Sequence, residues 1–551
     1  MLLLPSFSPF ARNFAWRARR HGRISSWLAG ALFGLSGLAA GAQDLNFPVK
    51  EGLGVLDSAF VPTEREAAPA QPPPSTPPPI RATTAVPATV LAALTRAGVP
   101  ISALSALVVP VNGAGIEKLR HQAERPVNPA SVMKLVTTYA AIDMLGPDFT
   151  WRTDFYTDGP VAGGTLRGNL YVRGGGDPKL VLERIQVTFR ALQDKGVKVI
   201  LGDMVLDHSA FDLPAHDAGE FDGESLRPYN TSPDGLLVNF KSVVLTFQPD
   251  AAAGVARVVS EPPMAGLAVD ATVPLSKAGC GNWRDALQGR FEDANAIRFV
   301  GSYPARCGEK VWPVAYQDPG SYAERAFEGL WRASGGAITG QVRKGLMPPS
   351  ARPFYQARSL PLSDIISDVN QWSNNVMAQQ VFLTLGRLSP QRMEARSAGP
   401  GTFIPVRTGR WERSREVVNR WWKTTFGIHS APPVMENGSG LSRTERITPE
   451  GLVALLQHAA RHPQGQKFVD SLSVAGVSGT AARLARGPNS AAKGNAFVKT
   501  GTLNDVTGIA GYVDAVNGNR YAVVGFVNHP NATAARPALD ALLEWVAAQP
   551  R

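Results

Sequence analysis

One predicted helix constrains this chain more than any other stretch, because it carries a serine and a lysine one turn apart. Asn128 is a favourable N-cap, Pro129 suits the first helical position and Gly146 ends the apolar pattern, so a helix is predicted between them. Ser131 and Lys134 are three positions apart and therefore share one face of this helix. A serine hydroxyl is a poor nucleophile until a base takes its proton, and a lysine can be that base when burial lowers its pKa.

The Ser-x-x-Lys spacing is a weak signal by itself. It is expected by chance about once in a chain of this length, and a second copy occurs at Ser490 and Lys493. That copy lies between Gly487 and Gly494, which predicts a loop rather than a helix. A catalytic interpretation of Ser131 therefore requires further elements at suitable distances.

The N-terminal residues are typical of an export signal. Five arginines accompany an apolar run over 27–38 that is too short for a comfortable membrane span, and small residues at 40–42 suit cleavage. We predict a signal peptide over 1–42, cleaved near Ala42, and hence an exported, periplasmic protein. The alternative is an uncleaved membrane anchor, because the basic region is long.

The remaining chain is only moderately basic. The formal charge of the whole sequence is +11, and removal of the five N-terminal arginines leaves +6. No run of basic residues interleaved with aromatic ones is present, so no nucleic-acid partner is predicted. Cys280 and Cys307 are the two cysteines, and in an exported chain they predict one disulfide closing a loop of about 28 residues. Two distant cysteines are too few for a metal site, and neither metal nor cofactor is predicted.

Composition divides the 551 residues into segments. Residues 43–87 include a proline-rich stretch and form a predicted extended linker, so folding is expected to begin near Ala88. Residues 158–356 are rich in glycine, proline and short apolar runs, with no helix longer than 180–195, which predicts one or two inserted β-rich domains. The predicted strands in this region are 170–172, 199–201, 236–238, 242–247 and 255–259.

Helical patterning returns from Leu360 onward. Residues 387–420 contain eight arginines and no long apolar face, so this segment is predicted to be a solvated excursion. Further helices are predicted at 89–97, after Leu362, at 449–462 behind the cap Thr448, and at 536–548. Further strands are predicted at 105–111, 497–501, 509–513 and 521–527.

Two later motifs complete the first one. Ser373-Asn374-Asn375 is a polar patch at a predicted helix junction, and Lys499-Thr500-Gly501-Thr502 ends a predicted strand. A strand that ends in Lys-Thr-Gly places a cation beside a hydroxyl, and its glycine allows a substrate backbone to approach closely. Ser-x-x-Lys, a Ser-x-Asn motif and Lys-Thr-Gly follow one another in the order that penicillin-binding proteins and class A β-lactamases share. The copy at Ser490 fails this test, because the Ser-x-Asn motif precedes it.

Over about 88–551 the sequence resembles the D-alanyl-D-alanine carboxypeptidase/endopeptidases among the low-molecular-mass, class C penicillin-binding proteins. Further support comes from Arg-Gly-Asn-Leu-Tyr-Val-Arg-Gly-Gly-Gly-Asp-Pro at 167–178 and Asn-Gly-Ser-Gly-Leu-Ser-Arg at 437–443. The long interval between the first two motifs also fits this subfamily, which carries inserted domains there. Asn374 is a departure, because the family more often has aspartate at this position.

The resemblance implies an α+β fold. We expect a transpeptidase-like domain, helix–antiparallel sheet–helix, assembled from 88–157 and 357–551, with the β-rich insertion at 158–356.

The resemblance also implies an acyl-enzyme mechanism on a D-Ala-D-Ala terminus or a D-Ala cross-link of peptidoglycan. Ser131 would attack the carbonyl and Lys134 would be the base. Ser373 would relay a proton to the leaving amine. Asn375 would hold the substrate amide and orient Lys134. A β-lactam would acylate the same serine and remain attached.

The third motif would bind the terminal carboxylate through Lys499, Thr500 and Thr502, with Gly501 allowing close approach. Backbone N–H groups of Ser131 and Thr502 would form the oxyanion hole. Of the two lysines, Lys134 is expected to be the more buried and to lose its proton first, whereas Lys499 stays charged.

Rival interpretations differ in their observable chemistry. A β-lactamase would turn over a chromogenic cephalosporin, which the length and the insertion argue against. A non-catalytic wall-binding or β-lactam-sensing protein would cleave no muropeptide. His458 and His462 are four apart without the glutamate of a zinc-peptidase helix, so they are predicted to form a solvated helix end. The histidines at 208, 216 and 429 have no triad context.

Overall fold

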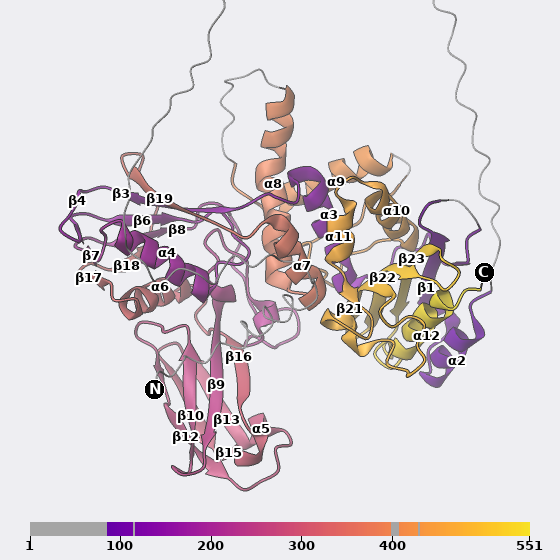
Figure 1. The fold of residues 1–551 in the computed structure, drawn as a ribbon, viewed down its shortest axis with the longest axis horizontal. Helices are drawn as coiled ribbons and strands as arrows, with labels where there is room; N and C mark the ends of the chain where they lie inside the picture. Colours follow the sequence, from indigo (N-terminus) through magenta and orange to yellow (C-terminus); the bar gives the residue numbers. More distant parts are fainter. Residues whose placement is uncertain (1–84, 114–115, 398–406, 428–429, 551) are drawn as a thin grey trace, which may run out of the picture. The chain divides into compact units, whose positions relative to one another are not determined.

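The computed structural model describes residues 85–113, 116–397, 407–427 and 430–550 (Figure 1). The predicted signal peptide over 1–42 and nearly all of the predicted linker lie outside these residues. Across the described part of the chain, no helix is both long and apolar enough to cross a membrane.

The largest sheet of the described chain is antiparallel and six-stranded, in the order β2-β1-β23-β22-β21-β20. Its strands are β1 (Leu104–Pro110), β2 (Leu119–His121), β20 (Ser473–Val474), β21 (Ala496–Leu503), β22 (Val506–Asp514) and β23 (Arg520–Asn528). β1 pairs with β23 along its whole length, so the two ends of the described chain meet in one sheet (Figure 1).

Helices cover both faces of this sheet because its strands alternate apolar side chains between two cores. Leu107 and Val524 belong to one core, whereas Val108 and Val523 belong to the other. The second core contains α2 (Ala88–Arg96) and α12 (Arg536–Ala547). The first contains α3 (Lys134–Leu145), α7 (Leu362–Trp372), α8 (Asn375–Ser397), α9 (Trp411–Phe426), α10 (Pro449–Arg461) and α11 (Gly465–Asp470). The predicted α+β class and the helix–antiparallel sheet–helix arrangement are confirmed.

A mixed five-stranded sheet, in the order β18-β8-β6-β3-β19, stands where the insertion leaves and rejoins the chain. Its strands are β3 (Arg152–Thr157), β6 (Leu170–Arg173), β8 (Met204–Asp207), β18 (Val342–Lys344) and β19 (Arg352–Arg358). β3 pairs with β19, so the two predicted insertion points lie on neighbouring strands. A smaller sheet holds β4 (Val161–Ala162), β5 (Thr165–Leu166), β7 (Val199–Ile200) and β17 (Ala337–Ile338).

The middle of the insertion is a lobe of short strands around an aromatic core. Its strands are β9 (Ser242–Asp250), β10 (Val255–Glu261), β11 (Ala268–Val269), β12 (Thr272–Ser276), β13 (Leu287–Asp293), β14 (Ala296–Gly301), β15 (Tyr303–Pro304) and β16 (Lys310–Ala315). Phe247 stacks on Tyr303 and meets Trp283 edge to face. Cys280 and Cys307 form the predicted disulfide here, with Cα atoms 4.7 Å apart.

Most predicted elements are present, and two predictions are wrong. The insertion is β-rich, as predicted, and it contains the predicted helix α4 (Leu182–Asp194) together with an unpredicted one, α6 (Tyr322–Ala333). These two helices pack through the rings of Phe189 and Trp331. Residues 236–238 are a buried turn with a single bridge to Leu180 rather than a strand.

The basic segment 387–420 is the second correction, since it is not simply a solvated excursion. The described parts belong largely to α8 and α9, and α9 buries Ser414, Val418 and Trp422 at helical spacing. Arginines lie between these positions in the sequence, on other sides of the helix. A prediction based on composition therefore did not detect the apolar face.

Candidate active site

Ser131 lies in a short turn of helix that is closely packed against neighbouring backbone. Residues Ala130–Met133 form a 3₁₀ turn, η2, that continues directly into α3. The Oδ1 atom of Asn128 accepts the backbone N–H of Ala130 at 2.8 Å, so the predicted capping residue does contact the first turn. Ala130 adopts a φ of 46°, and a Cβ atom on Gly440 would lie 1.9 Å from its carbonyl oxygen. Only glycine fits at position 440, and the chain there packs directly on the Ser131 turn.

Lys134 connects the turn to two other segments. Its Nζ donates to Ser131 Oγ at 3.0 Å, to Asn375 Oδ1 at 2.7 Å and to the carbonyl of Ser439. The lysine side chain is fully buried, whereas Ser131 is partly exposed. The first predicted pair is therefore in hydrogen-bond contact, with the ammonium inside and the hydroxyl at the surface.

The Ser-x-Asn motif lies at the junction of α7 and α8. Ser373 ends α7 in the left-handed conformation, with φ 60° and ψ 35°. Asn374 Oδ1 accepts the N–H of Met377 at 3.0 Å, so an amide performs the capping task that an aspartate would also perform. Asn375 donates through Nδ2 to the carbonyl of Tyr229 at 3.0 Å, which directs its Oδ1 to Lys134.

The Lys-Thr-Gly motif occupies the open end of β21. β20 pairs with β21 only at Phe497 and Val498, so the strand edge beyond them carries no partner strand in the described structure. Lys499 Nζ donates to Ser373 Oγ and to the carbonyl of Thr500, both at 2.8 Å. The Thr500 hydroxyl contacts Thr480 at 2.8 Å, and Thr502 is half-buried at the edge.

Gly501 also lies close to another part of its own chain. A Cβ atom at this position would lie 2.6 Å from the carbonyl of Pro129 and 3.1 Å from the backbone nitrogen of Val132. The bare face of this glycine is therefore already in contact with the Ser131 turn of its own chain. Its close approach fixes β21 beside Ser131.

The two lysines have unusual electrostatics. Burial lowers the pKa of Lys134 from 10.5 to about 7, and the negative charge of Glu445 opposes this lowering. Burial also lowers the pKa of Lys499 well below its usual value, and the charges of Lys134 and Arg483 lower it further. The expectation that Lys134 is the more buried lysine is wrong, because both side chains are 0% exposed.

Sequence reasoning missed four contacts of this site: Tyr229, Ser439, Thr480 and Glu445. The first two act through backbone carbonyls, which carry no signal in the identity of the side chain. Gly438 and Gly440 flank Ser439 with positive φ values, and this pair of glycines was the one available hint of a tight loop. Glu445 resembles any surface glutamate in the sequence, yet it is 0% exposed.

The histidine pair is also more buried than predicted. His458 contacts the hydroxyl of Tyr139 through Nδ1, and burial lowers the pKa of its ring. His462 Nε2 lies 3.2 Å from Asp143 Oδ1. The two rings pack among aromatic side chains instead of ending a solvated helix. In the described ranges no group of three potential metal ligands is present, and His429 lies outside them.

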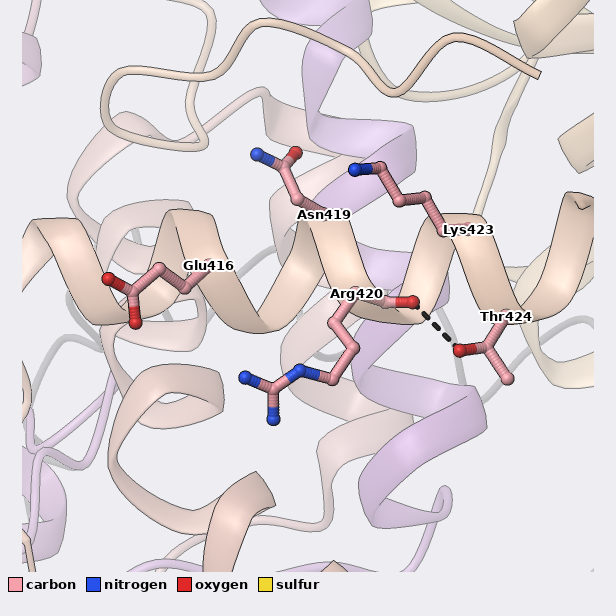
Figure 2. A pocket seen from close by; sticks show the side chains of 5 residues that line it. All are labelled: Glu416, Asn419, Arg420, Lys423 and Thr424. Atoms are coloured by element: carbon pink, nitrogen blue, oxygen red, sulfur yellow. Dashed lines mark hydrogen bonds between the residues drawn. The ribbon is translucent and has the colours of Figure 1, made fainter. Parts of the chain in front are cut away.

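A separate hollow of about 660 Å³ lies on α9, and Figure 2 shows its lining side chains projecting from that helix. The residues that line it are Glu416, Asn419, Arg420, Lys423 and Thr424. None of them belongs to the three motifs. The chemistry of the predicted motifs therefore gathers elsewhere, where η2, the α7–α8 junction and β21 meet.

The chain is similar in sequence and fold to known D-alanyl-D-alanine carboxypeptidases. The chain is 28% identical over 436 residues to a D-alanyl-D-alanine carboxypeptidase of an Actinomadura species, a match that spans 76% of each chain. It is 24% identical over 406 residues to D-alanyl-D-alanine carboxypeptidase DacB of Haemophilus influenzae, spanning 72% of this chain and 80% of that one. The crystal structure of penicillin binding protein 4 (dacB) from H. influenzae has the same fold, with a TM-score of 0.63 at 21% identity, covering 82% of this chain and 99% of the other.

The extent of the family match decides the identity. Residues 91–549 match the model of the D-Ala-D-Ala carboxypeptidase 3 (S13) family, which is most of the chain and includes all three motifs. The predicted resemblance and the predicted class of enzyme are confirmed. The chain belongs to the D-Ala-D-Ala carboxypeptidase 3 (S13) family and is a serine-type D-Ala-D-Ala carboxypeptidase.

Proposed function

We propose that Ser131 is the nucleophile of this enzyme and that the substrate is a D-Ala-D-Ala terminus or a D-Ala cross-link of peptidoglycan. The observation that carries the assignment is the contact between Ser131 Oγ and a fully buried lysine amine whose pKa is lowered to about 7. Near neutral pH such an amine loses its proton readily and can accept the one on Ser131.

Acylation begins when Ser131 Oγ attacks the peptide carbonyl and its proton passes to Lys134 Nζ. The oxyanion that forms is stabilised by the backbone N–H groups of Ser131 and Thr502. The tight packing of Gly501 on the Ser131 turn supports this pairing, because it keeps the following residue beside the nucleophile. Asn375 holds the substrate amide next to the base it already contacts.

As the bond between the carbonyl carbon and the leaving nitrogen breaks, the proton that Lys134 took from Ser131 is relayed through Ser373 to the leaving amine, and Ser373 regains its own proton in the relay. Lys499 contacts the Ser373 hydroxyl at 2.8 Å. The terminal carboxylate binds Lys499 together with the hydroxyls of Thr500 and Thr502. An anion at this position raises the pKa of Lys499 and favours its charged form, and the resulting repulsion favours neutral Lys134. Substrate binding thereby leaves Lys134 in the form that acts as a base.

Water then releases the acyl group. A β-lactam is attacked in the same way, and its ring-opened acyl group stays on the serine. A solved complex of H. influenzae penicillin binding protein 4 with a β-lactam supports the proposal that β-lactams bind this chain as well. We also propose that the chain is exported to the periplasm after cleavage near Ala42. The disulfide supports export, since such bonds persist in oxidising compartments.

Covalent labelling by a fluorescent penicillin tests the nucleophile. We expect Ser131→Ala to abolish labelling while the melting temperature stays close to that of the wild type. The matched control is Ser490→Ala in the second Ser-x-x-Lys copy. Ser490 lies in a loop and its hydroxyl contacts Glu544 of α12, so this variant should be labelled normally. Wild-type labelling of Ser131→Ala would refute the assignment.

Mass spectrometry of sacculi before and after digestion identifies the bond that is cleaved. Loss of terminal D-Ala reports carboxypeptidase activity, and loss of cross-linked dimers reports endopeptidase activity. Absence of both changes with active, labelled enzyme would contradict the proposed substrate.

A further inference from the structure

Glu445 is a buried carboxylate that the mechanism above does not use. Its side chain is 0% exposed. Oε1 accepts the backbone N–H groups of Glu436 at 2.9 Å, Asn437 at 3.1 Å and Gly438 at 3.1 Å. Oε2 is also buried, and among the described residues it has no hydrogen-bond partner. Burial raises the pKa of this carboxyl above its usual value, and the three N–H groups on Oε1 oppose that rise by stabilising the ionised form.

The backbone held by Glu445 meets the Ser131 turn at three points. The carbonyl of Ser439 accepts from Lys134 Nζ. The carbonyl of Gly438 accepts from the Thr137 hydroxyl at 2.6 Å, one turn farther along α3. Gly440 packs on the carbonyl of Ala130. One buried carboxylate therefore anchors the loop that contacts the base and the turn of the nucleophile.

The charged groups around Lys134 come from three segments. β21 supplies Lys499, and η6 (Gly479–Arg483) supplies Arg483 beyond it; both are positive. The loop supplies Glu445, whose negative charge acts on Lys134. Glu436 belongs to the same loop, but its Oε2 accepts from the hydroxyls of Ser442 and Thr444.

We propose that Glu445 is a positioning residue for acylation: it holds the Ser439 carbonyl against Lys134 Nζ, and its negative charge stabilises the ammonium that forms there. In this step the Oγ–H bond of Ser131 breaks, the Oγ–carbonyl bond forms and the proton arrives on Lys134. The inference rests on the proposed roles of Ser131 and Lys134. A carboxylate that supports a protonated base in this way makes the base stronger and the transition state more stable.

The test is the pH dependence of the second-order acylation rate by one penicillin, measured from pH 5 to 10. In wild type the rate should rise with pH as Lys134 loses its proton. Glu445→Gln removes the charge but keeps the shape, so Lys134 becomes a weaker base. We expect the acid limb to move to lower pH by about one unit, and the plateau rate to fall at least about tenfold.

Two matched variants isolate the charge. Glu436→Gln neutralises a second carboxylate of the same loop, and its acid limb should stay in place. Glu445→Asp keeps the charge on a shorter side chain, so its acid limb should also stay near that of wild type while its plateau falls. Melting temperatures show that each variant is folded.

If Glu445→Gln lowers the plateau of the acylation rate but leaves the acid limb of its pH profile in place, Glu445 has only a structural role. That result would overturn the proposal. Where Glu445→Gln does not fold, Glu445→Asp decides, and a wild-type plateau in that variant would equally overturn it. Failure of the proposed function has a separate signature, because Lys134→Arg would then be acylated as fast as wild type.

Discussion

Lys134 and Lys499 are chemically alike, and we propose different tasks for them. Each ammonium contacts one hydroxyl of the site, Ser131 in the first case and Ser373 in the second. Both are fully buried, and the charge of one disfavours the charge of the other. A bound carboxylate would resolve this competition in favour of a charge on Lys499. In the proposed mechanism, the bound substrate therefore decides which lysine loses its proton, because the two are equally buried.

Arginine substitutions should separate these tasks. Lys134→Arg places a group that does not deprotonate beside Ser131, so we expect the penicillin acylation rate to fall by about 10²–10⁴-fold. Lys499→Arg keeps the charge in a different shape and should weaken carboxylate substrates while retaining part of the acylation. Stopped-flow acylation of both folded variants by one penicillin is the measurement. Equal losses, or the milder loss in Lys134→Arg, would contradict the assignment.

At the residue scale, sequence spacing predicted contacts between residues close together in the chain. It missed contacts between residues that are distant in sequence and meet only in the folded protein. Ser131 and Lys134 were recognised because a helix places positions three apart on one face. Tyr229 and Thr480 join the site from distant segments through a carbonyl and a hydroxyl that look ordinary in sequence. The depth of Lys499 was misjudged, because burial depends on packing around β21 and not on the motif itself.

At the scale of elements, the contact between β21 and η2 determines the geometry of the site. We expect Gly501→Ala to force these two backbones apart, because the added Cβ meets backbone atoms of Pro129 and Val132. Overpacking of this kind costs about 1–3 kcal/mol in unfolding free energy, and acylation should fall with it. Gly487→Ala is the matched control, since no atom lies within 4 Å of its added Cβ. Wild-type acylation by both variants would show that this contact does not position Ser131.

Elements with strong local signals were predicted well. Thr448 accepts the N–H of Gly451 at 3.0 Å and caps α10 as expected, and Asn517-Gly518 turns β22 into β23. α9 was missed because its apolar face is interrupted by arginines that composition alone counts as solvent-exposed. The apolar run at 236–238 looked like a strand, but it is buried as a turn against α4 and the neighbouring strands.

At the scale of the molecule, the insertion is tied to the helix that starts at Asn375. Gln380 accepts the N–H of Asp234 at 2.9 Å and donates to its carbonyl at 3.0 Å. Lys179 pairs with Asp368 on α7, and Tyr229 contacts Asn375 itself. Composition indicated where the insertion lies, but these ties depend on single side chains from segments that meet only in the folded chain. The insertion therefore contributes directly to the orientation of Asn375.

The lobe that holds the disulfide, residues 242–315, makes none of these contacts with α7 and α8. Cys280 and Cys307 pack against the aromatic core around Phe247, and no residue of the three motifs belongs to that core. A variant with both cysteines changed to serine should lose about 2–4 kcal/mol of unfolding free energy in this lobe, since the bond restricts the unfolded loop. Its penicillin acylation rate should stay within about twofold of wild type, because Tyr229 and Asp234 lie outside the loop that the bond closes.

Chemical unfolding followed by the fluorescence of Trp283 and Trp312 measures the unfolding free energy of the lobe, and reduced wild type should match the variant. A large loss of acylation would show instead that the lobe and the catalytic site are energetically coupled.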